Sequence, residues 1–267
     1  MTAAENVRPV LGAFDAAALD ARRLAPLLWD PVAAATLARS RPGAGERVLD
    51  ACCGTGPSAL PAALAVGADG IVDAVDLAAS AVGLLAGQAA GLPQLRPRVG
   101  DVTTWEPAGY DVVQCVLGIF FLPDPAAGTG HLVHRAREGG RVALTIWQRD
   151  ALVPAGRALL AAVSDVRGTS MPVPAPSEVV QRLGDREAFA SWLLDRGLVD
   201  VEVDEAPLTF PVDAESLWLL VQGSGFRGML AGLDDEAVER ARRGYLERLV
   251  DGPPVDATSL VGWGRRR

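Results

Sequence analysis

Between residues 47 and 147 the chain alternates short apolar runs with segments of helical periodicity. The apolar runs cover 47–52, 71–76, 95–100, 111–117 and 141–147, and the helical segments cover 57–66, 78–90 and 125–137. The runs lack the apolar–polar alternation of a half-exposed strand, which is typical of strands buried on both faces. This order of elements predicts an α/β fold whose parallel sheet is covered by helices on both sides.

The segments outside this region are predicted to be mostly helical. Residues 14–40 carry apolar side chains at three- and four-residue spacing, interrupted by Pro26 and Pro31. After residue 147 we expect helices at 151–163 and 186–196, a proline-rich loop at 168–177, strands at 199–203 and 258–263, and two or three helices within 211–250. Within the last of these, Gly223-Ser224-Gly225 predicts a hinge or tight turn.

All 25 basic residues of the chain are arginine, and lysine does not occur. The phosphate loop of P-loop nucleotide hydrolases, the active site of protein kinases and every Schiff-base enzyme need a lysine, so these classes are excluded. The 33 acidic residues give a formal charge of −8, and the chain has no basic run. Since binding to a duplex requires clustered cations, we expect no nucleic-acid partner.

The 267 residues fit one large domain or one domain with a cap. We expect no membrane span, because no apolar stretch is long enough to cross a bilayer. We also expect no signal peptide, because residues 1–6 lack a basic flank and a long apolar core. The cysteines, Cys52, Cys53 and Cys115, have neither metal-ligand spacing nor a disulfide pattern, so we expect no metal and a cytoplasmic protein.

The most informative segment is residues 48–57, with the sequence VLDACCGTGP. A strand ends in Asp50, and glycines then turn directly into a helix whose first N–H groups are free for a ligand. Gly54 to Ala59 also fits the dinucleotide pattern G-x-G-x-x-[G/A], with Asp76 at the expected distance. An NAD-type oxidoreductase is therefore one alternative. However, Asp50 would repel a pyrophosphate, and the lack of lysine excludes the Tyr/Lys pair of short-chain dehydrogenases.

This segment resembles motif I of the class I S-adenosylmethionine methyltransferases, in the form V-L-D-x-x-C-G-T-G. It is similar to the ubiquinone/menaquinone-biosynthesis-like branch and to small-molecule enzymes of natural-product pathways. Further motifs of the family follow in order within residues 40–150, namely Ala74–Leu77, Val99–Val102, Tyr110–Gly118 and Gly139–Leu144. One departure from the family pattern is Cys52, which stands where the first glycine of D-x-G-x-G-x-G is usual.

The resemblance implies a Rossmann-like sheet of seven strands, mostly parallel with the last one antiparallel, and a helical cap or lid. In these terms residues 1–267 form one methyltransferase domain. It is divided into an N-terminal cap at 1–43, a cofactor-binding core at 44–150, lid insertions at 151–184 and 207–256, and segments at 185–206 and 257–267 that complete the sheet.

The resemblance also implies S-adenosylmethionine as cofactor and S-adenosylhomocysteine as product. Asp76 would then hold the ribose hydroxyls, Asp101 would accept the adenine amine, and Asp50 would lie near the ammonium. The residues implied to bind the cofactor are Asp50, Cys52, Gly54, Thr55, Gly56, Asp76, Leu77, Asp101, Val102, Cys115 and Leu117. Such a cofactor has no phosphate, so its site needs no lysine.

The chain offers few candidates for a catalytic base. His131 and His134 fall on the helix after the fourth strand, and we interpret them as an exposed helix face rather than a catalytic pair. Gln148 and Asp150 follow the fifth strand at its carboxyl edge, where either could orient an acceptor, and Asp150 could equally cap the next helix. No residue is assigned as the base.

Aromatic side chains on segments that cover the cofactor mouth in this fold are candidates for the acceptor pocket. They are Trp29, Phe120, Phe121, Trp147, Trp218 and Phe226, with Gln148 as a polar neighbour. Core packing is the alternative for each aromatic residue. An apolar lid predicts a small, fairly hydrophobic acceptor, with O-methylation favoured, in bacterial secondary metabolism. A protein that binds the cofactor but acts as a non-methylating cyclase or binding module is a further alternative, and a monomer or homodimer is expected.

Overall fold

The computed structural model describes residues 3–171 and 176–267. Seven strands form one sheet in the order β3-β2-β1-β4-β5-β9-β6. Their bounds are β1 Arg47–Ala51, β2 Ile71–Asp76, β3 Leu95–Val99, β4 Tyr110–Val116, β5 Ala136–Trp147, β6 Leu198–Ala206 and β9 Ser259–Arg266. The pairs among β1 to β5 are parallel, and β9 is antiparallel to both of its neighbours. The predicted mostly parallel sheet of seven strands, with an antiparallel last strand, is confirmed.

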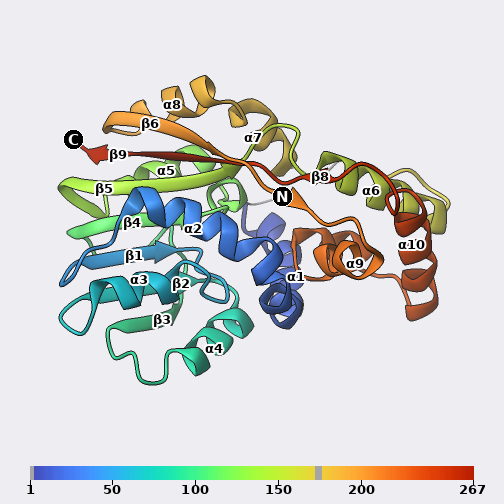
Figure 1. Ribbon diagram of the computed structural model, residues 1–267, viewed down its shortest axis with the longest axis horizontal. Coiled ribbons are helices and arrows are strands. Elements are labelled where there is room, and N and C mark those ends of the chain that lie inside the picture. The colour runs from blue at the N-terminus through green and yellow to red at the C-terminus, as the bar shows by residue number, and fades with distance from the viewer. Residues whose placement is uncertain (1–2, 172–175) are drawn as a thin grey trace.

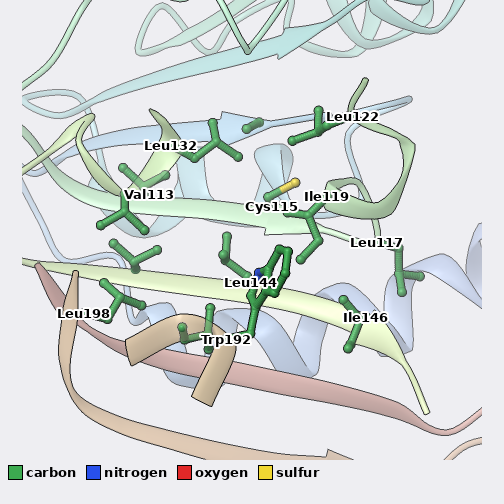
Figure 2. Packing of buried hydrophobic residues seen from close by; sticks show 14 of the residues in the cluster. Val113, Cys115, Leu117, Ile119, Leu122, Leu132, Leu144, Ile146, Trp192 and Leu198 are labelled. Carbon is green, nitrogen blue, oxygen red and sulfur yellow. The ribbon is translucent and has the colours of Figure 1, made fainter. Parts of the chain in front are cut away.

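Helices cover both faces of the sheet because successive strand residues point to opposite sides. On one face lie α2 (Trp29–Ser40), α3 (Ala59–Val66) and α4 (Ala79–Gln88), and on the other lie α5 (Pro125–Val133) and α8 (Arg186–Leu194) (Figure 1). Val48 packs toward α3, whereas its neighbour Leu49 belongs to the opposite core. Figure 2 shows that second core, to which both Trp192 of α8 and Leu144 of β5 belong. Burial on both faces explains the continuous apolar runs.

A second group of helices forms a lobe beside the carboxyl ends of the parallel strands (Figure 1). It consists of α6 (Val153–Arg167), α9 (Ala214–Gln222), α10 (Asp235–Glu247) and the 3₁₀ helix η3 (Gly225–Leu230). These elements share their own hydrophobic core. A short sheet joins β7 (Thr209–Phe210) to β8 (Val255–Asp256) at the base of the lobe.

The N-terminal helices connect the two parts. Helix α1 (Ala3–Leu24) contacts α4 on the sheet side and both α9 and η3 in the lobe. The 3₁₀ helix η1 (Ala25–Leu27), which contains Pro26, separates it from α2. The predicted division of 14–40 at its prolines therefore agrees with the structure at Pro26, whereas Pro31 lies within the first turn of α2.

Other boundaries differ from the sequence-based expectation. Helix α5 ends at Val133 rather than 137, and β5 begins at Ala136 rather than 141. The register of β4 against β5 shifts between Tyr110 and Val112. Gly139 and Gly140 therefore lie in the irregular start of β5 rather than in a turn before it. Helix α7 (Pro176–Leu183) was not predicted, and residues 172–175 of the predicted loop lie outside the described residues. None of the described helices is long and apolar enough to cross a membrane.

Candidate active site

The turn from β1 into α3 is built on backbone conformations that favour glycine. Gly54 has a φ of 52° and Gly56 a φ of 98°. A Cβ on Gly56 would lie 2.3 Å from Cδ1 of Leu85, so this glycine lets α3 and α4 pack closely. A Cβ on Gly54 would meet no atom within 4 Å. Open space therefore lies above Gly54, at the carboxyl edge of the sheet where α/β proteins bind ligands.

Asp76 ends β2 beside this loop. The backbone N–H of Gly54 donates to its Oδ2 at 2.8 Å, and the N–H of Ala78 donates to Oδ1 at 2.8 Å. Burial raises the pKa of Asp76, and the backbone hydrogen bonds partly oppose that shift. The next side chain, Leu77, remains 39 % exposed. The loop and the β2 terminus thus form one hydrogen-bonded unit with an apolar neighbour.

Asp50 is held below the loop. Its side chain is fully buried, and Ser58 Oγ donates to Oδ2 at 2.7 Å. Burial raises the pKa of Asp50 to about 7, and the hydrogen bond from Ser58 lowers it only in part. Among the described residues Oδ1 has no hydrogen-bond partner within normal geometry. Asp50 therefore anchors the first turn of α3 from inside the protein.

A third acid, Asp101, follows the end of β3. The backbone N–H and the hydroxyl of Thr103 both donate to its Oδ1, at 2.8 and 2.7 Å. Asp101 is half-buried, while the neighbouring Val102 is buried. Since β3, β2 and β1 are adjacent in the sheet, the three acids lie at neighbouring strand ends.

The end of β4 contacts the glycine loop through sulfur. Cys115 is paired with Ala51 in the sheet register, which brings it beside Cys52. A Cβ on Gly118 would lie 2.7 Å from the Sγ atoms of both cysteines, so these thiols flank one small space. Cys52 (φ 57°) and Leu117 (φ 54°) both adopt the left-handed conformation that costs a non-glycine residue about 1 kcal/mol or more.

Aromatic side chains surround the region between the strand ends and the lobe. Trp29 and Trp147 lie 6.4 Å apart, and each contacts both the sheet core and the lobe core. Phe121 packs against Phe120 at 4.7 Å and meets Phe14 of α1 edge-on at 5.0 Å. These residues give the strand ends an apolar cover.

A methyltransferase domain model matches residues 48–140, which include the glycine loop and all three acids. Aklanonic acid methyltransferase DauC of Streptomyces sp. (strain C5) is 31 % identical over 142 residues, which is 52 % of this chain and 64 % of that protein. The match therefore spans under two thirds of that relative. Residues 48–140 therefore resemble a methyltransferase domain, which agrees with the resemblance of the sequence motifs to the class I S-adenosylmethionine methyltransferases.

Other methyltransferases are similar over different extents. Trans-aconitate 2-methyltransferase of Klebsiella pneumoniae (strain 342) is 28 % identical, with 81 % of each chain covered. Nocamycin O-methyltransferase of Saccharothrix syringae is 36 % identical, over 43 % of this chain and 42 % of that one. Among solved structures, YcgJ of Bacillus subtilis shares the fold with a TM-score of 0.54 at 15 % identity, covering 88 % of this chain and 98 % of that one.

The residues present fit the cofactor of this methyltransferase family. The open space above Gly54 leaves room for a ligand against the backbone, and the exposed side chain of Leu77 offers an apolar surface for a flat ring. Asp76 and Asp101 are half-buried at neighbouring strand ends, and their carboxylates can accept hydrogen bonds from hydroxyl and amine donors. Thr55 is buried within the loop.

Several predicted site residues lie elsewhere in the methyltransferase fold. Trp218 is buried in the lobe core, and its ring lies 6.4 Å from that of Tyr245. This position agrees with the alternative that Trp218 is a core residue rather than part of the acceptor pocket. Gln148 lines a shallow surface cavity shared with Asp185 and Glu187 on the α8 side of the sheet. Asp150 does not cap α6 with its side chain, because the N-cap is Leu152 and no side-chain cap bond forms. We therefore leave these three out of the proposed site.

The remaining candidates lie in the lobe or on the α5 side of the sheet. Phe226 in η3 lies near α6, where a Cβ on Gly156 would be 3.5 Å from its ring. His131 contacts the carbonyl of Trp105 and His134 that of Gly130, both on the α5 side. Sequence reasoning missed Phe14, since an isolated phenylalanine on α1 gives no signal of its long-range contact with Phe121.

Proposed function

We propose that this protein is a methyltransferase, which transfers a methyl group from S-adenosylmethionine to an oxygen atom of a small, fairly hydrophobic molecule. The observation that carries the proposal is the unit formed by the Gly54–Gly56 turn and Asp76, joined by the hydrogen bond from Gly54 N–H to the Asp76 carboxylate. The free space above the backbone of Gly54, next to the carboxylate of Asp76, suits a ligand that carries hydroxyl groups and no phosphate.

Each part of the site has a distinct task in this proposal. Asp76 accepts hydrogen bonds from the ribose hydroxyls, and Asp101 accepts the adenine amine beside Leu77 and Val102. The loop residues Cys52, Gly54, Thr55 and Gly56 line the methionine end, with Cys115 and Leu117 opposite. Asp50 acts through the loop that it anchors, because its carboxyl group is fully buried. When bound, S-adenosylmethionine supplies an electrophilic methyl group on a sulfonium.

The protein contributes orientation and exclusion of water. Displacement at the methyl carbon requires the acceptor oxygen in line with the breaking carbon–sulfur bond. In the proposal, Trp29, Trp147 and Phe121 hold the apolar body of the acceptor against the strand ends, with Phe120 behind Phe121. Phe226 closes the lobe side. An aromatic enclosure of this kind favours a hydrophobic acceptor.

The acceptor oxygen is one that is already ionised at neutral pH, such as a carboxylate or an acidic enol. The chain has no lysine, and both histidine rings are bonded to backbone carbonyls on the α5 side of the sheet. An ionised acceptor needs no general base, whereas an aliphatic alcohol does. The names of two relatives, an aklanonic acid methyltransferase and a trans-aconitate methyltransferase, support an acidic acceptor. The name of a third, a nocamycin O-methyltransferase, supports oxygen as the methylated atom and a role in secondary metabolism.

Calorimetric titration tests cofactor binding first. The folded protein should bind S-adenosylmethionine and S-adenosylhomocysteine, and the absence of heat at high micromolar ligand would overturn the proposal. Selective binding of NADH would instead favour an oxidoreductase.

Product mass then tests the reaction. A panel of hydrophobic carboxylic acids, acidic enols and matched alcohols should yield products heavier by one methylene, with acids and enols preferred. Unchanged mass of a consumed substrate would identify a cyclase or isomerase. A preference for the alcohols would contradict the assignment of an ionised acceptor.

A further inference from the structure

Two cysteines from separate strands meet at the mouth of the candidate site. Cys52 follows β1 directly, and Cys115 lies in β4, where its Cα is paired with that of Ala51. Neighbouring strands lie about 4.8 Å apart, so one residue beyond a paired position is within the Cα separation of roughly 4.4–6.8 Å that a disulfide takes. Figure 2 shows Cys115 near the end of β4, beside Ile119.

The backbone around the pair is shaped to admit both sulfur atoms. Gly118 lies against them, and a Cβ there would be 2.6 Å from the Cβ of Cys52 and 2.7 Å from each Sγ. Only glycine therefore fits at 118 while both thiols keep their places. Cys52 holds a left-handed φ of 57°, which a glycine would adopt without strain. Position 52 therefore holds a cysteine in a strained backbone conformation, and the absence of a side chain at Gly118 leaves room for its sulfur atom.

We propose that Cys52 and Cys115, which are distant in sequence but adjacent in space, form a dithiol pair that a hydroperoxide converts to a disulfide. We propose further that this disulfide blocks the cofactor site. Cys52 is partly exposed whereas Cys115 is fully buried, so a hydroperoxide reaches Cys52 first. The neighbouring Cys115 and burial raise the pKa of the Cys52 thiol, so the thiolate that attacks is a minor form at neutral pH. Its sulfur attacks the peroxide oxygen, an S–O bond forms and the O–O bond breaks, which gives a sulfenic acid and an alcohol or water. Cys115 sulfur then displaces the sulfenic oxygen, which leaves as water with the thiol proton.

The disulfide would alter the loop that carries Gly54. Cys52 lies only two residues before Gly54, and its side chain would be tied to β4 in place of its present packing against Gly118. A loop fixed in another geometry loses preorganisation for its ligand. This second part of the proposal rests on the proposed function, whereas the formation of the disulfide does not.

Cys53 provides an internal control. It is buried on the opposite side of the sheet among the residues that pack on α3, with its Sγ 3.7 Å from the carbonyl oxygen of Gly54. It neighbours Cys52 in sequence but takes no part in the pair. Cys53→Ser should therefore retain disulfide formation.

The experiment treats the full-length protein with hydrogen peroxide and measures intact mass, free thiols and the linked peptides. We expect a loss of two hydrogens, a fall from three free thiols to one, and a Cys52–Cys115 link. Cys52→Gly and Cys115→Ser should abolish the link, and Cys52→Gly should fold at least as stably as the parent because glycine suits the left-handed backbone. Absence of any link, or a link through Cys53, would overturn the site.

The consequence for binding is measured on the same samples. Titration with S-adenosylhomocysteine should show affinity weakened at least about tenfold in the oxidised protein and restored by dithiothreitol. Unchanged affinity after complete disulfide formation would overturn the blocking effect. If the reduced protein binds no S-adenosylhomocysteine but the link still forms, the proposed function fails while the dithiol site stands.

Discussion

The carboxyl group of Asp50 and the carboxamide of Gln114 are buried side by side across the β1–β4 pair. Their Cα atoms are register partners, and both side chains are fully buried. Ser58 donates to Asp50 from the α3 side, and Ser40 of α2 donates to Gln114 Oε1 at 2.9 Å. A buried polar row therefore runs from α2 to the start of α3 beneath the glycine loop, and its one titratable group has a pKa of about 7.

The first prediction concerns the pH dependence of stability. Burial raises the pKa of Asp50 from 3.8 to about 7 in the folded protein, whereas the unfolded chain keeps an ordinary value. Between these values the folded state binds the additional proton, so the free energy of unfolding falls as pH rises from about 4 to about 7. We expect Asp50 to contribute a loss on the order of a few kcal/mol across this interval.

Urea unfolding of the parent and of Asp50→Asn at pH 5 and pH 8 checks this. Asparagine is neutral at both values, so the variant should lose less stability than the parent between them. A parent and variant with parallel pH profiles would show that Asp50 titrates at its ordinary pKa.

The sheet could be predicted from the sequence because its strands are buried on both faces. Continuous apolar runs such as those of β1 and β4 leave little choice of structure, and each proved a strand within one residue of its predicted bounds. Helix α7 and the β7–β8 pair gave no such signal. Their segments are short, and their conformation depends on contacts with distant elements rather than on local periodicity.

The candidate site was only partly accessible to sequence reasoning. The strand-end positions of Asp76 and Asp101 follow from the order of elements, since parallel strands end at one edge. The burial of Trp218 in the lobe and the contact of Phe14 with Phe121 depend on how α1 and α9 pack, which no local pattern encodes.

The second prediction tests the ribose assignment. Asp76→Ala should weaken binding of S-adenosylhomocysteine at least about tenfold, because hydrogen bonds to a charged acceptor are lost. Asp76→Asn separates charge from shape, and it should bind better than alanine but less well than the parent. Asp69→Ala removes an exposed acid before the other end of β2 and is the matched control. Calorimetry should show the control unchanged, and equal affinity in all variants would refute the assignment.

The third prediction separates the roles of the two loop glycines. Gly56→Ala should lower the free energy of unfolding by about 2–4 kcal/mol, because its Cβ collides with Leu85 and its φ is left-handed. Gly54→Ala has open space, so it should cost only about 1 kcal/mol of stability. Its methyl group would enter the cofactor space, so S-adenosylhomocysteine binding should weaken more than stability suggests. Denaturant unfolding paired with calorimetry measures both, and equal stability losses would contradict the close-packing role of Gly56.

The fourth prediction concerns the histidines. Burial lowers the pKa of His131, and both rings contact backbone carbonyls on the α5 side of the sheet. The double variant His131→Gln, His134→Gln should therefore keep kcat within about twofold on an acidic acceptor, since general-base catalysis contributes far more than this. A fall of a hundredfold in kcat, with thermal stability and cofactor affinity unchanged, would assign a histidine as the base.

The last prediction tests the aromatic cover. Trp29 lies 6.4 Å from Trp147 and joins the sheet core to the lobe core above the strand ends. Replacing the indole with the smaller ring of Trp29→Phe should remove about 1 kcal/mol of aromatic contact, which corresponds to a roughly fivefold rise in acceptor KM. Affinity for S-adenosylhomocysteine should stay unchanged, because Trp29 covers the acceptor side rather than the nucleotide side. Trp263→Phe is the matched control, since this residue lies in β9 and donates to Asp204 at 2.9 Å, away from the strand ends. If both variants raise KM equally, or if Trp29→Phe weakens only cofactor binding, Trp29 does not line the acceptor pocket.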